Sequence, residues 1–390
     1  MSKPLLFTPI QLRDLTLRSR LIISPMATYS AVDGIANDWH LGHYARLALG
    51  GPALVMVEAT GVTEQGRITN GCLGLWSDAH ARALKRIADF MKAQKVVPAI
   101  QLGHGGRKSS MQRPWHGNGP LTPEDLARGD RKWEIVGPTS EPLGPGWIAP
   151  SALSIPDIKK LIGDWASAAR RAVEAGFEMI EIHNAHGYLV HQFLSPLVNK
   201  RNDAYGGDLE GRTRFPLELA EAVRAAVPKG MPLSVRISAV DGVDGGWSIE
   251  DSVAYARALK ERGIDLIACS SGGLTGSATT ARIKRSWGFQ VPFAAKVKRE
   301  AGIGTIAVGL IVDPHHAEHI LVKGDADLIA IGREALANPS WPQMAEIALG
   351  RKPFDAMDDW PVQYGWWLKH RERSLEQVRA DYGDDWRKTA

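Results

Sequence analysis

Two histidines and a tyrosine stand close together in the sequence, directly after a short apolar run. The run Phe177–Ile180 is followed within a few residues by His183, His186 and Tyr188. Two imidazoles three residues apart can donate hydrogen bonds to one oxygen atom, and a phenol two residues further on can supply a proton nearby. The segment therefore predicts a site that polarises a carbonyl and protonates the carbon next to it.

Metal binding is the less favoured interpretation of these histidines. Zinc needs three or four ligands at suitable spacing, and the sequence has neither a His-Glu-x-x-His motif nor a cysteine cluster to supply them. We therefore predict no metal site, and we expect a structural role for the nearby His191.

Eight short β-rich segments recur along the chain, and most of them are almost continuously apolar. Strands that are buried on both faces have this pattern. Amphipathic stretches with helical spacing lie between them, such as Ile155–Ala175, Arg214–Val227 and Ser248–Arg262. The predicted strands are Leu21–Ser24, Ala53–Ala59, Val96–Gln101, Met179–His183, Leu233–Ile237, Leu266–Ser270, Thr305–Val308 and Leu328–Ile331.

Eight strands that alternate with helices predict an α/β fold of the (β/α)₈ or TIM barrel type. A doubly wound Rossmann sheet is the alternative, but no Gly-x-Gly-x-x-Gly motif follows the first strand. We predict a single barrel domain at 1–340, with a cap inserted after the third strand at about 103–154. The remaining tail, 341–390, contains five of the thirteen tryptophans, and we expect it to pack against the barrel or a partner subunit.

Composition limits the classes of function. Apolar residues make up 44% and charged residues 23% of the 390 residues, which is typical of a globular enzyme. A net charge of +4 favours neither a nucleic-acid partner nor a membrane surface. The only cysteines, Cys72 and Cys269, predict a reducing compartment and exclude a four-cysteine iron–sulfur cluster. The chain start has no signal-peptide pattern and no apolar run is long enough for a membrane helix, so we expect a cytoplasmic protein.

Residues that follow the predicted strands are the candidates for a barrel's active site. Gly309 and Gly332-Arg333 follow the seventh and eighth strands, where barrels often bind phosphate; a surface ion pair is the alternative role for Arg333. Arg236 ends the fifth strand and could stabilise electron density on an aromatic ring, whose edge Gln101 could recognise. These residues together predict a phosphorylated aromatic cofactor.

The chain resembles the Old Yellow Enzyme family of FMN-dependent ene reductases, in particular its thermophilic-like branch with the bacterial xenobiotic reductases. The resemblance runs nearly from end to end and depends on ordered motifs. They are Ser24-Pro25-Met26 with Tyr29, Asn37–His40 with His43-Tyr44, Glu58–Thr60, Gly66–Thr69, Trp76–Asp78, Gln101–Lys108, Ala149–Ser151, His183–Tyr188, Arg201–Gly207, Arg212–Phe215 and Ile331–Glu334.

The resemblance implies roles for individual residues. His183 and His186 would bind the substrate oxygen, Tyr188 would be the proton donor, and Tyr29 would contact the substrate. The residues implied in FMN binding are Ser24, Pro25, Met26, Ala27, Ala59, Gln101, Arg236, Gly309, Gly332 and Arg333.

The resemblance also implies the reaction of an NADPH dehydrogenase and ene reductase. NADPH, in preference to NADH, would reduce the flavin and leave, and an α,β-unsaturated ketone, aldehyde, imide or nitro compound would then take its place. An alternative is the dehydrogenation or demethylation of amines or ring compounds, although such relatives often carry an iron–sulfur cluster. A barrel that only binds a flavin or another small ligand is a second alternative.

Two positions depart from the pattern of the branch. Ala27 stands where many members have a cysteine, which should alter the flavin redox potential and widen the pocket. Some relatives insert an arginine from the tail into a neighbouring subunit's site, whereas this tail has Trp366 and Trp367. We therefore predict a homodimer or homotetramer in which Trp367 contacts the substrate and favours apolar or flat molecules.

Overall fold

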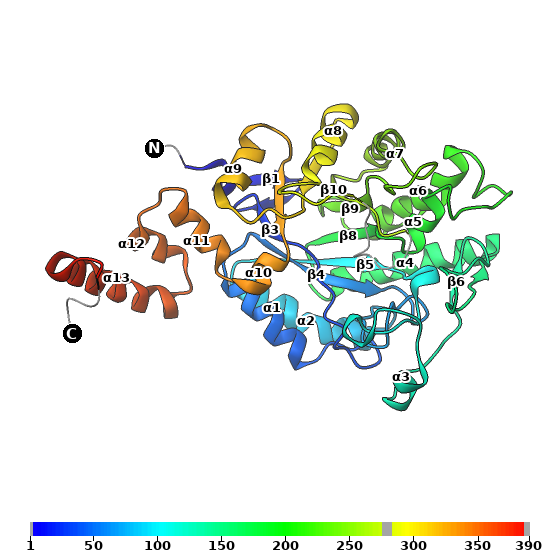
Figure 1. Ribbon diagram of the computed structural model, residues 1–390, viewed down its shortest axis with the longest axis horizontal. Helices are drawn as coiled ribbons and strands as arrows, with labels where there is room; N and C mark the ends of the chain where they lie inside the picture. Colours follow the sequence, from blue (N-terminus) through cyan, green and yellow to red (C-terminus); the bar gives the residue numbers. More distant parts are fainter. Residues whose placement is uncertain (1–2, 275–282, 386–390) are drawn as a thin grey trace.

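Eight parallel strands form a closed barrel in the computed structural model, which describes residues 3–274 and 283–385 (Figure 1). This confirms the predicted (β/α)₈ fold, and each predicted strand agrees with an observed one within two residues at either end. In order around the barrel, the strands are β3 (Leu21–Ile23), β4 (Leu54–Gly61), β5 (Val97–Gly103), β8 (Met179–Asn184), β9 (Leu233–Ser238), β10 (Leu266–Ser270), β11 (Gly304–Ala307) and β12 (Leu328–Ile331).

Helices surround the barrel and cover the outward faces of its strands (Figure 1). Several begin at a capping box, in which two residues cap each other. At the start of α4, the Ser154 side chain accepts a hydrogen bond from the backbone N–H of Asp157, and the Asp157 side chain accepts one from the backbone N–H of Ser154. The surrounding helices are α1 (Asp38–Leu49), α2 (Asp78–Ala93), α4 (Ile155–Glu174), α5 (Leu189–Leu194), α6 (Leu209–Ala226), α7 (Ile249–Glu261), α8 (Val291–Ala301), α9 (Pro314–Val322) and α10 (Arg333–Ala337).

Side chains along each strand point alternately outward to the helices and inward to the barrel axis, which divides the core into two layers. In β4, Val55 and Val57 pack in the cluster shared with the helices, whereas Leu54 and Met56 belong to the separate cluster inside the barrel. An antiparallel hairpin, β1 (Ile10–Leu12) and β2 (Leu15–Leu17), adds its apolar side chains to this inner cluster. Because the inner cluster contains the first residues of several strands, the hairpin closes the N-terminal end of the barrel.

The segment between β5 and α4 is the one for which we predicted a cap, and its role as a cap stays a prediction. It contains the short elements η2 (Gly106–Lys108), η3 (Pro114–His116), α3 (Pro123–Ala127), β6 (Val136–Gly137) and β7 (Ser151–Ala152). Its Trp133 packs on the guanidinium of Arg67, which lies 5.1 Å from that ring and 5.5 Å from the ring of Trp76. Arg67 thus connects the cap to the loop after β4.

The C-terminal tail contains α11 (Trp341–Ala348), α12 (Pro353–Ala356), η4 (Met357–Asp359) and α13 (Val362–Tyr382). Trp341 is buried and its Nε1 donates to the carbonyl oxygen of Val312 at 2.9 Å, so this part of the tail packs on the barrel. Trp366 and Trp367 are 55% and 68% exposed on α13, at the opposite end of the molecule from α3 (Figure 1). Trp386 lies outside the described residues.

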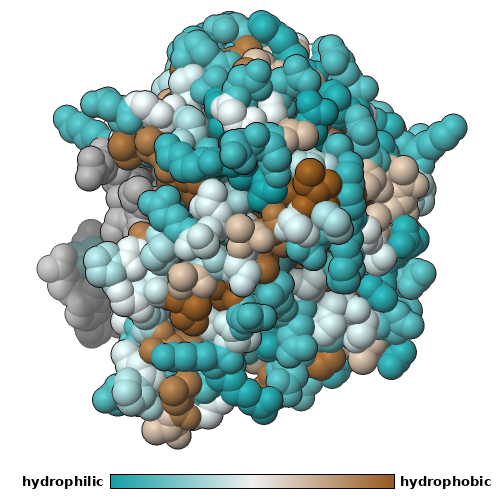
Figure 2. All heavy atoms as spheres, turned by 90° about the vertical axis from the view of Figure 1, so that its right-hand side faces the viewer, coloured by the Kyte–Doolittle hydropathy of each residue, from teal (hydrophilic) through white to brown (hydrophobic). Residues whose placement is uncertain are grey.

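The face at the cap end is mainly hydrophilic, with small separate apolar patches (Figure 2). A large continuous apolar patch would be expected at a stable protein interface.

Among the described residues, none of the helices has the length and apolar character needed to cross a membrane.

Candidate active site

Every second side chain of strand β8 points into the barrel, and this alternation positions the candidate catalytic residues. Met179, Glu181 and His183 are two residues apart, and Met179 belongs to the apolar cluster inside the barrel. Glu181 lies one layer higher, where it accepts hydrogen bonds from Gln101 Nε2 at 2.8 Å and Ser234 Oγ at 3.2 Å. His183 follows at the mouth of the barrel, above a fully apolar base and a polar middle layer.

The turn after β8 brings His183, His186 and Tyr188 together, as the sequence predicted. The ring centroids of His183 and His186 are 5.1 Å apart, and those of His183 and Tyr188 are 5.0 Å apart. His186 and Tyr188 are separated by 6.5 Å. His186 has a left-handed backbone with φ 62°, which few residues other than glycine adopt.

His183 is held as a neutral hydrogen-bond donor. Its Nδ1 accepts the backbone N–H of Ala185 at 3.2 Å, so the ring hydrogen must be on Nε2. Burial, reinforced by the charge of Arg236, holds the pKa of His183 well below its ordinary value. The Nε2–H group is therefore available to a ligand oxygen at neutral pH.

His186 is neutral for the same physical reasons and is oriented by a serine. Burial and the nearby His183 and Arg236 hold the pKa of His186 well below its ordinary value. Its Nε2 lies 2.7 Å from Ser270 Oγ, which accepts a hydrogen bond from Gln290 Nε2 at 3.2 Å. Ser270 can then donate its own hydrogen to His186 Nε2, which leaves the ring hydrogen on Nδ1 as a second donor for a ligand.

Tyr188 keeps its proton, because burial raises the pKa of the phenol. The ammonium of Lys108 lies 5.7 Å from the centre of the Tyr188 ring. Lys108 donates to the carbonyl oxygens of His186, at 2.9 Å, and of Gly273. Burial lowers the pKa of Lys108 to about 7.

Two adjoining cavities, of about 500 Å³ and about 150 Å³, open at the C-terminal ends of the strands. They share Pro25, His186 and Arg236 in their linings. The predicted residues that complete the larger cavity are Ser24, Met26, Gly309, Gly332 and Arg333. Those that complete the smaller cavity are Ala27, Tyr29, Ala59, Gln101, His183 and Tyr188.

The linings fit a phosphorylated aromatic cofactor such as FMN. The combined volume is in the range of small-molecule sites. Arg236 is half-buried in the lining of both cavities and its Nε has no hydrogen-bond partner among the described residues, so this donor is left for a ring. Gly309 lines the larger cavity with φ 106°, and a Cβ there would lie 2.8 Å from Gln290 Oε1, so both the backbone conformation and the space favour glycine at this position.

Several residues of the site were not predicted as site residues. Gln290 and Phe289 line the larger cavity immediately before α8, and no strand end or motif indicates them. Trp115 of the cap makes an edge contact with Tyr29, with ring centroids 5.9 Å apart. Trp367, which was predicted to contact the substrate, lines neither cavity of its own chain. Its contact with a neighbouring subunit's site stays a prediction.

Together, the closed barrel and its cavities with neutral imidazoles, a phenol and an arginine whose Nε is free fit a barrel enzyme with a cofactor site. The model of the "NADH:flavin oxidoreductase / NADH oxidase family" matches residues 5–351. The chain belongs to this family.

Curated relatives are similar over nearly the whole chain. An NADPH dehydrogenase of Geobacillus thermodenitrificans (strain NG80-2) is 43% identical over 93% of this chain and 98% of its own length. An NADPH dehydrogenase of Bacillus subtilis (strain 168) is 41% identical over 93% of this chain and 99% of its own length. Among solved structures, morphinone reductase is 26% identical with a TM-score of 0.73, and the match covers 90% of this chain and 92% of that one.

Proposed function

We propose that this protein is an FMN-dependent NADPH dehydrogenase that reduces activated C=C bonds. Its substrates would be α,β-unsaturated ketones, aldehydes, imides and nitro compounds. The observation that carries the proposal is the grouping of His183, His186 and Tyr188 around the smaller cavity, which shares Arg236 and its free Nε with the larger one. The family and the relatives named NADPH dehydrogenase support it.

The residues divide between cofactor and substrate. FMN held in the larger cavity would supply the hydride chemistry that links NADPH to the alkene. Arg236 and Gln101 would bind the ring of the cofactor, and Gly309 with Gly332 and Arg333 would hold its phosphate. Pro25, Met26 and Ala27, in the loop after β3, would contact the ring, and Ser24 and Ala59 would complete its lining.

The substrate oxygen would accept hydrogen bonds from Nε2–H of His183 and Nδ1–H of His186. These bonds withdraw charge from the double bond and strengthen as negative charge develops on the oxygen. Loss of one such donor typically slows a reaction by ~10²–10³. Tyr188 would then give its proton to the α-carbon.

A neighbouring copy would complete the site. We propose that a homodimer or homotetramer brings the α13 of one subunit to the mouth of another, where Trp367 would contact flat or apolar substrates. The exposure of Trp366 and Trp367 supports this arrangement.

The direct test is a spectrum of the purified protein followed by an assay with NADPH and 2-cyclohexenone. We expect a flavin spectrum, release of FMN on denaturation, and NADPH oxidation with formation of cyclohexanone. Colourless protein that takes up no added FMN would contradict the cofactor assignment. A flavoprotein that oxidises NADPH but leaves every activated alkene intact would contradict the substrate class.

A further inference from the structure

The turn that carries the candidate catalytic side chains is held by an unusual backbone conformation. His186 and Gly187 are consecutive left-handed residues, with φ 62° and 73°. A non-glycine residue keeps such a conformation only when its surroundings determine it strongly. A Cβ at Gly187 would lie 2.3 Å from the carbonyl oxygen of Gly273, so the turn also packs tightly against the loop after β10.

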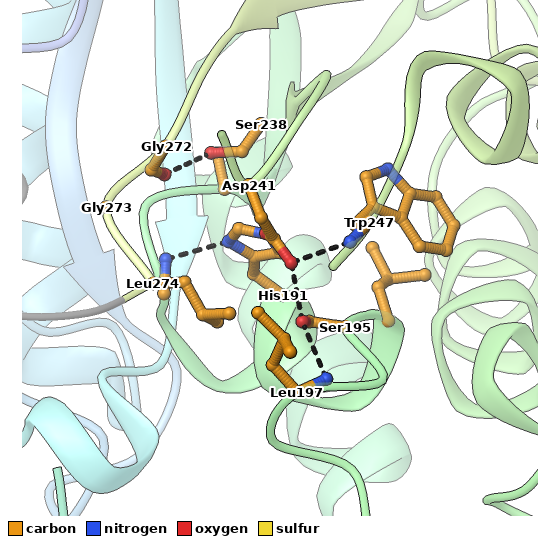
Figure 3. Close-up of polar contacts among 12 residues, drawn as sticks. His191, Ser195, Leu197, Ser238, Asp241, Trp247, Gly272, Gly273 and Leu274 are labelled. Atoms are coloured by element: carbon orange, nitrogen blue, oxygen red, sulfur yellow. Dashed lines mark hydrogen bonds and ion pairs between the residues drawn. The ribbon is translucent and has the colours of Figure 1, made fainter. Parts of the chain in front are cut away.

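Two side chains bind the two backbone N–H groups of this turn. The N–H of His186 donates to Ser238 Oγ at 2.9 Å, and the N–H of Gly187 donates to His191 Nδ1 at 2.9 Å. Ser238 Oγ in turn donates to the carbonyl oxygen of Gly272 at 2.7 Å (Figure 3). The end of β9, helix α5 and the loop after β10 therefore converge on one turn.

His191 is oriented by a buried carboxylate. Its Nε2 lies 2.8 Å from Asp241 Oδ1, and both side chains are 0% exposed. The other oxygen, Asp241 Oδ2, accepts from Ser195 Oγ at 2.6 Å and from the backbone N–H of Trp247 at 2.7 Å (Figure 3). Because His191 Nδ1 accepts the N–H of Gly187, the ring hydrogen is on Nε2, which is the ring nitrogen next to the carboxylate.

Asp241 has the charge needed to hold this tautomer. Burial alone would raise the pKa of Asp241, but His191 and the hydrogen bonds from Ser195 and Trp247 hold it below its ordinary value. A carboxylate next to a histidine fixes which ring nitrogen carries the hydrogen and which accepts. His191 Nδ1 is thereby kept as the acceptor for the backbone N–H of Gly187.

We infer that His191, oriented by Asp241, is a positioning residue that fixes the turn His186–Tyr188 and thereby aims the substrate-binding imidazole and the proton-donating phenol. Ser238 holds the same turn from the side of β9. The inference rests on the proposed function, since it concerns the alkene-reducing step. Neither His191 nor Asp241 lines the two cavities, so both act through the turn and not on the substrate.

The test compares two substitutions of His191 in the FMN-loaded enzyme. His191→Leu removes the acceptor, whereas His191→Asn keeps an oxygen close to the place of Nδ1. Displacement of reacting groups by about 1 Å can cost on the order of 100-fold in rate. In stopped-flow single turnovers, we expect His191→Leu to slow alkene reduction by about that factor and to leave flavin reduction by NADPH near the parent rate. His191→Asn should recover most of the loss.

A second measurement does not depend on activity. Hydrogen–deuterium exchange of the peptide that contains residues 185–189 should be faster in His191→Leu and in Asp241→Asn than in the parent. His319→Leu, which replaces an exposed histidine of α9, is the matched control and should change neither exchange nor rate. If His191→Leu does not fold, Asp241→Asn replaces it. We expect this variant too to slow alkene reduction without slowing flavin reduction, and to exchange faster at residues 185–189.

Distinct outcomes would overturn the inference and the proposed function. Equal slowing of both half-reactions, unchanged exchange at 185–189, or an Asn variant no faster than the Leu variant would each overturn the positioning role. A parent enzyme that reduces no activated alkene would overturn the proposed function. The exchange experiment would still decide whether His191 and Asp241 hold the turn.

Discussion

The imidazoles of His183 and His186 lie where positive charges surround them. Arg236 and Lys108 act together with burial to keep both rings neutral. The same positive charges would stabilise an oxygen that becomes negative during the reaction. The charge distribution of the site thus favours a ligand whose oxygen gains electron density over one that arrives as a cation.

Tyr188→Phe removes the proposed proton donor and little else, because the ring remains. We expect the alkene-reducing half-reaction to slow by ~10²–10⁴, the range for loss of a general acid. Reduction of the flavin by NADPH should keep its parent rate, since no proton from Tyr188 is needed there. Stopped-flow absorbance of the flavin in each half-reaction measures both, and equal slowing would contradict the assignment.

The pH dependence of Tyr188 catalysis follows from its raised pKa. A raised phenol pKa keeps the proton in place well into the alkaline range, and the proton is lost only as the pH passes that value. The ratio of parent to Tyr188→Phe rates in alkene reduction should therefore be constant from about pH 6 to about pH 9. Taking the ratio removes effects of Lys108, which is common to both proteins. A fall in the ratio below pH 9 would show that the phenol ionises earlier.

The sequence predicted the cavity-lining residues that stand next to strand ends or in the motif His183–Tyr188. It did not predict Gln290, which reaches the cavity from the start of a helix, or the pairing of His191 with Asp241. Asp241 is fifty residues from His191 in the sequence, and only the closed barrel brings β8 and β9 side by side. Long-range pairs of this kind leave no local pattern.

At the scale of elements, the cap depends on the guanidinium of Arg67 between Trp76 and Trp133. Arg67→Ala should lower the free energy of unfolding by about 1–2 kcal/mol, because two cation–π contacts are lost. Arg67→Lys should recover only part, since a compact ammonium cannot stack on two rings. Chemical denaturation measures the stability, and exchange in peptides of 111–152 reports on the cap.

Arg82→Ala, on the exposed side of α2, is the control for this experiment and should change stability by less than about 0.5 kcal/mol. Equal effects of Arg67→Ala and Arg82→Ala would show that the stacked guanidinium contributes nothing to the attachment of the cap.

Strands were predicted more accurately than helices, for physical reasons. The barrel strands are buried on both faces and therefore stand out as apolar runs. Helix α6 was predicted to begin at Arg214 but begins at Leu209, because Asp208 caps it by accepting from the N–H of Gly211. Gly211 and Pro216, which lie inside this helix, have low helix propensity and hide its first turns. Helices α1, α3, α5 and α10 to α13 were not predicted.

At the scale of the whole molecule, our proposal that α13 contacts another copy rests on its exposed aromatic side chains. Light scattering should give two or four times the mass of one chain. Replacement of both Trp366 and Trp367 by serine should shift the mass towards one chain and raise KM for flat substrates. Trp39→Ser, which changes a tryptophan that is 59% exposed on α1, is the control. Unchanged mass and KM in the double variant would contradict the proposed role of the tail.

The position of the β1–β2 hairpin has a consequence for how reactants enter the enzyme. The apolar cluster that the hairpin shares with the barrel strands fills this end of the barrel, so under the proposed function the nicotinamide donor and the alkene would both enter the cavities from the C-terminal ends of the strands and use the same space in turn. An excess of either reactant should therefore delay the arrival of the other, so that velocity declines at high alkene concentration and recovers when more NADPH is added.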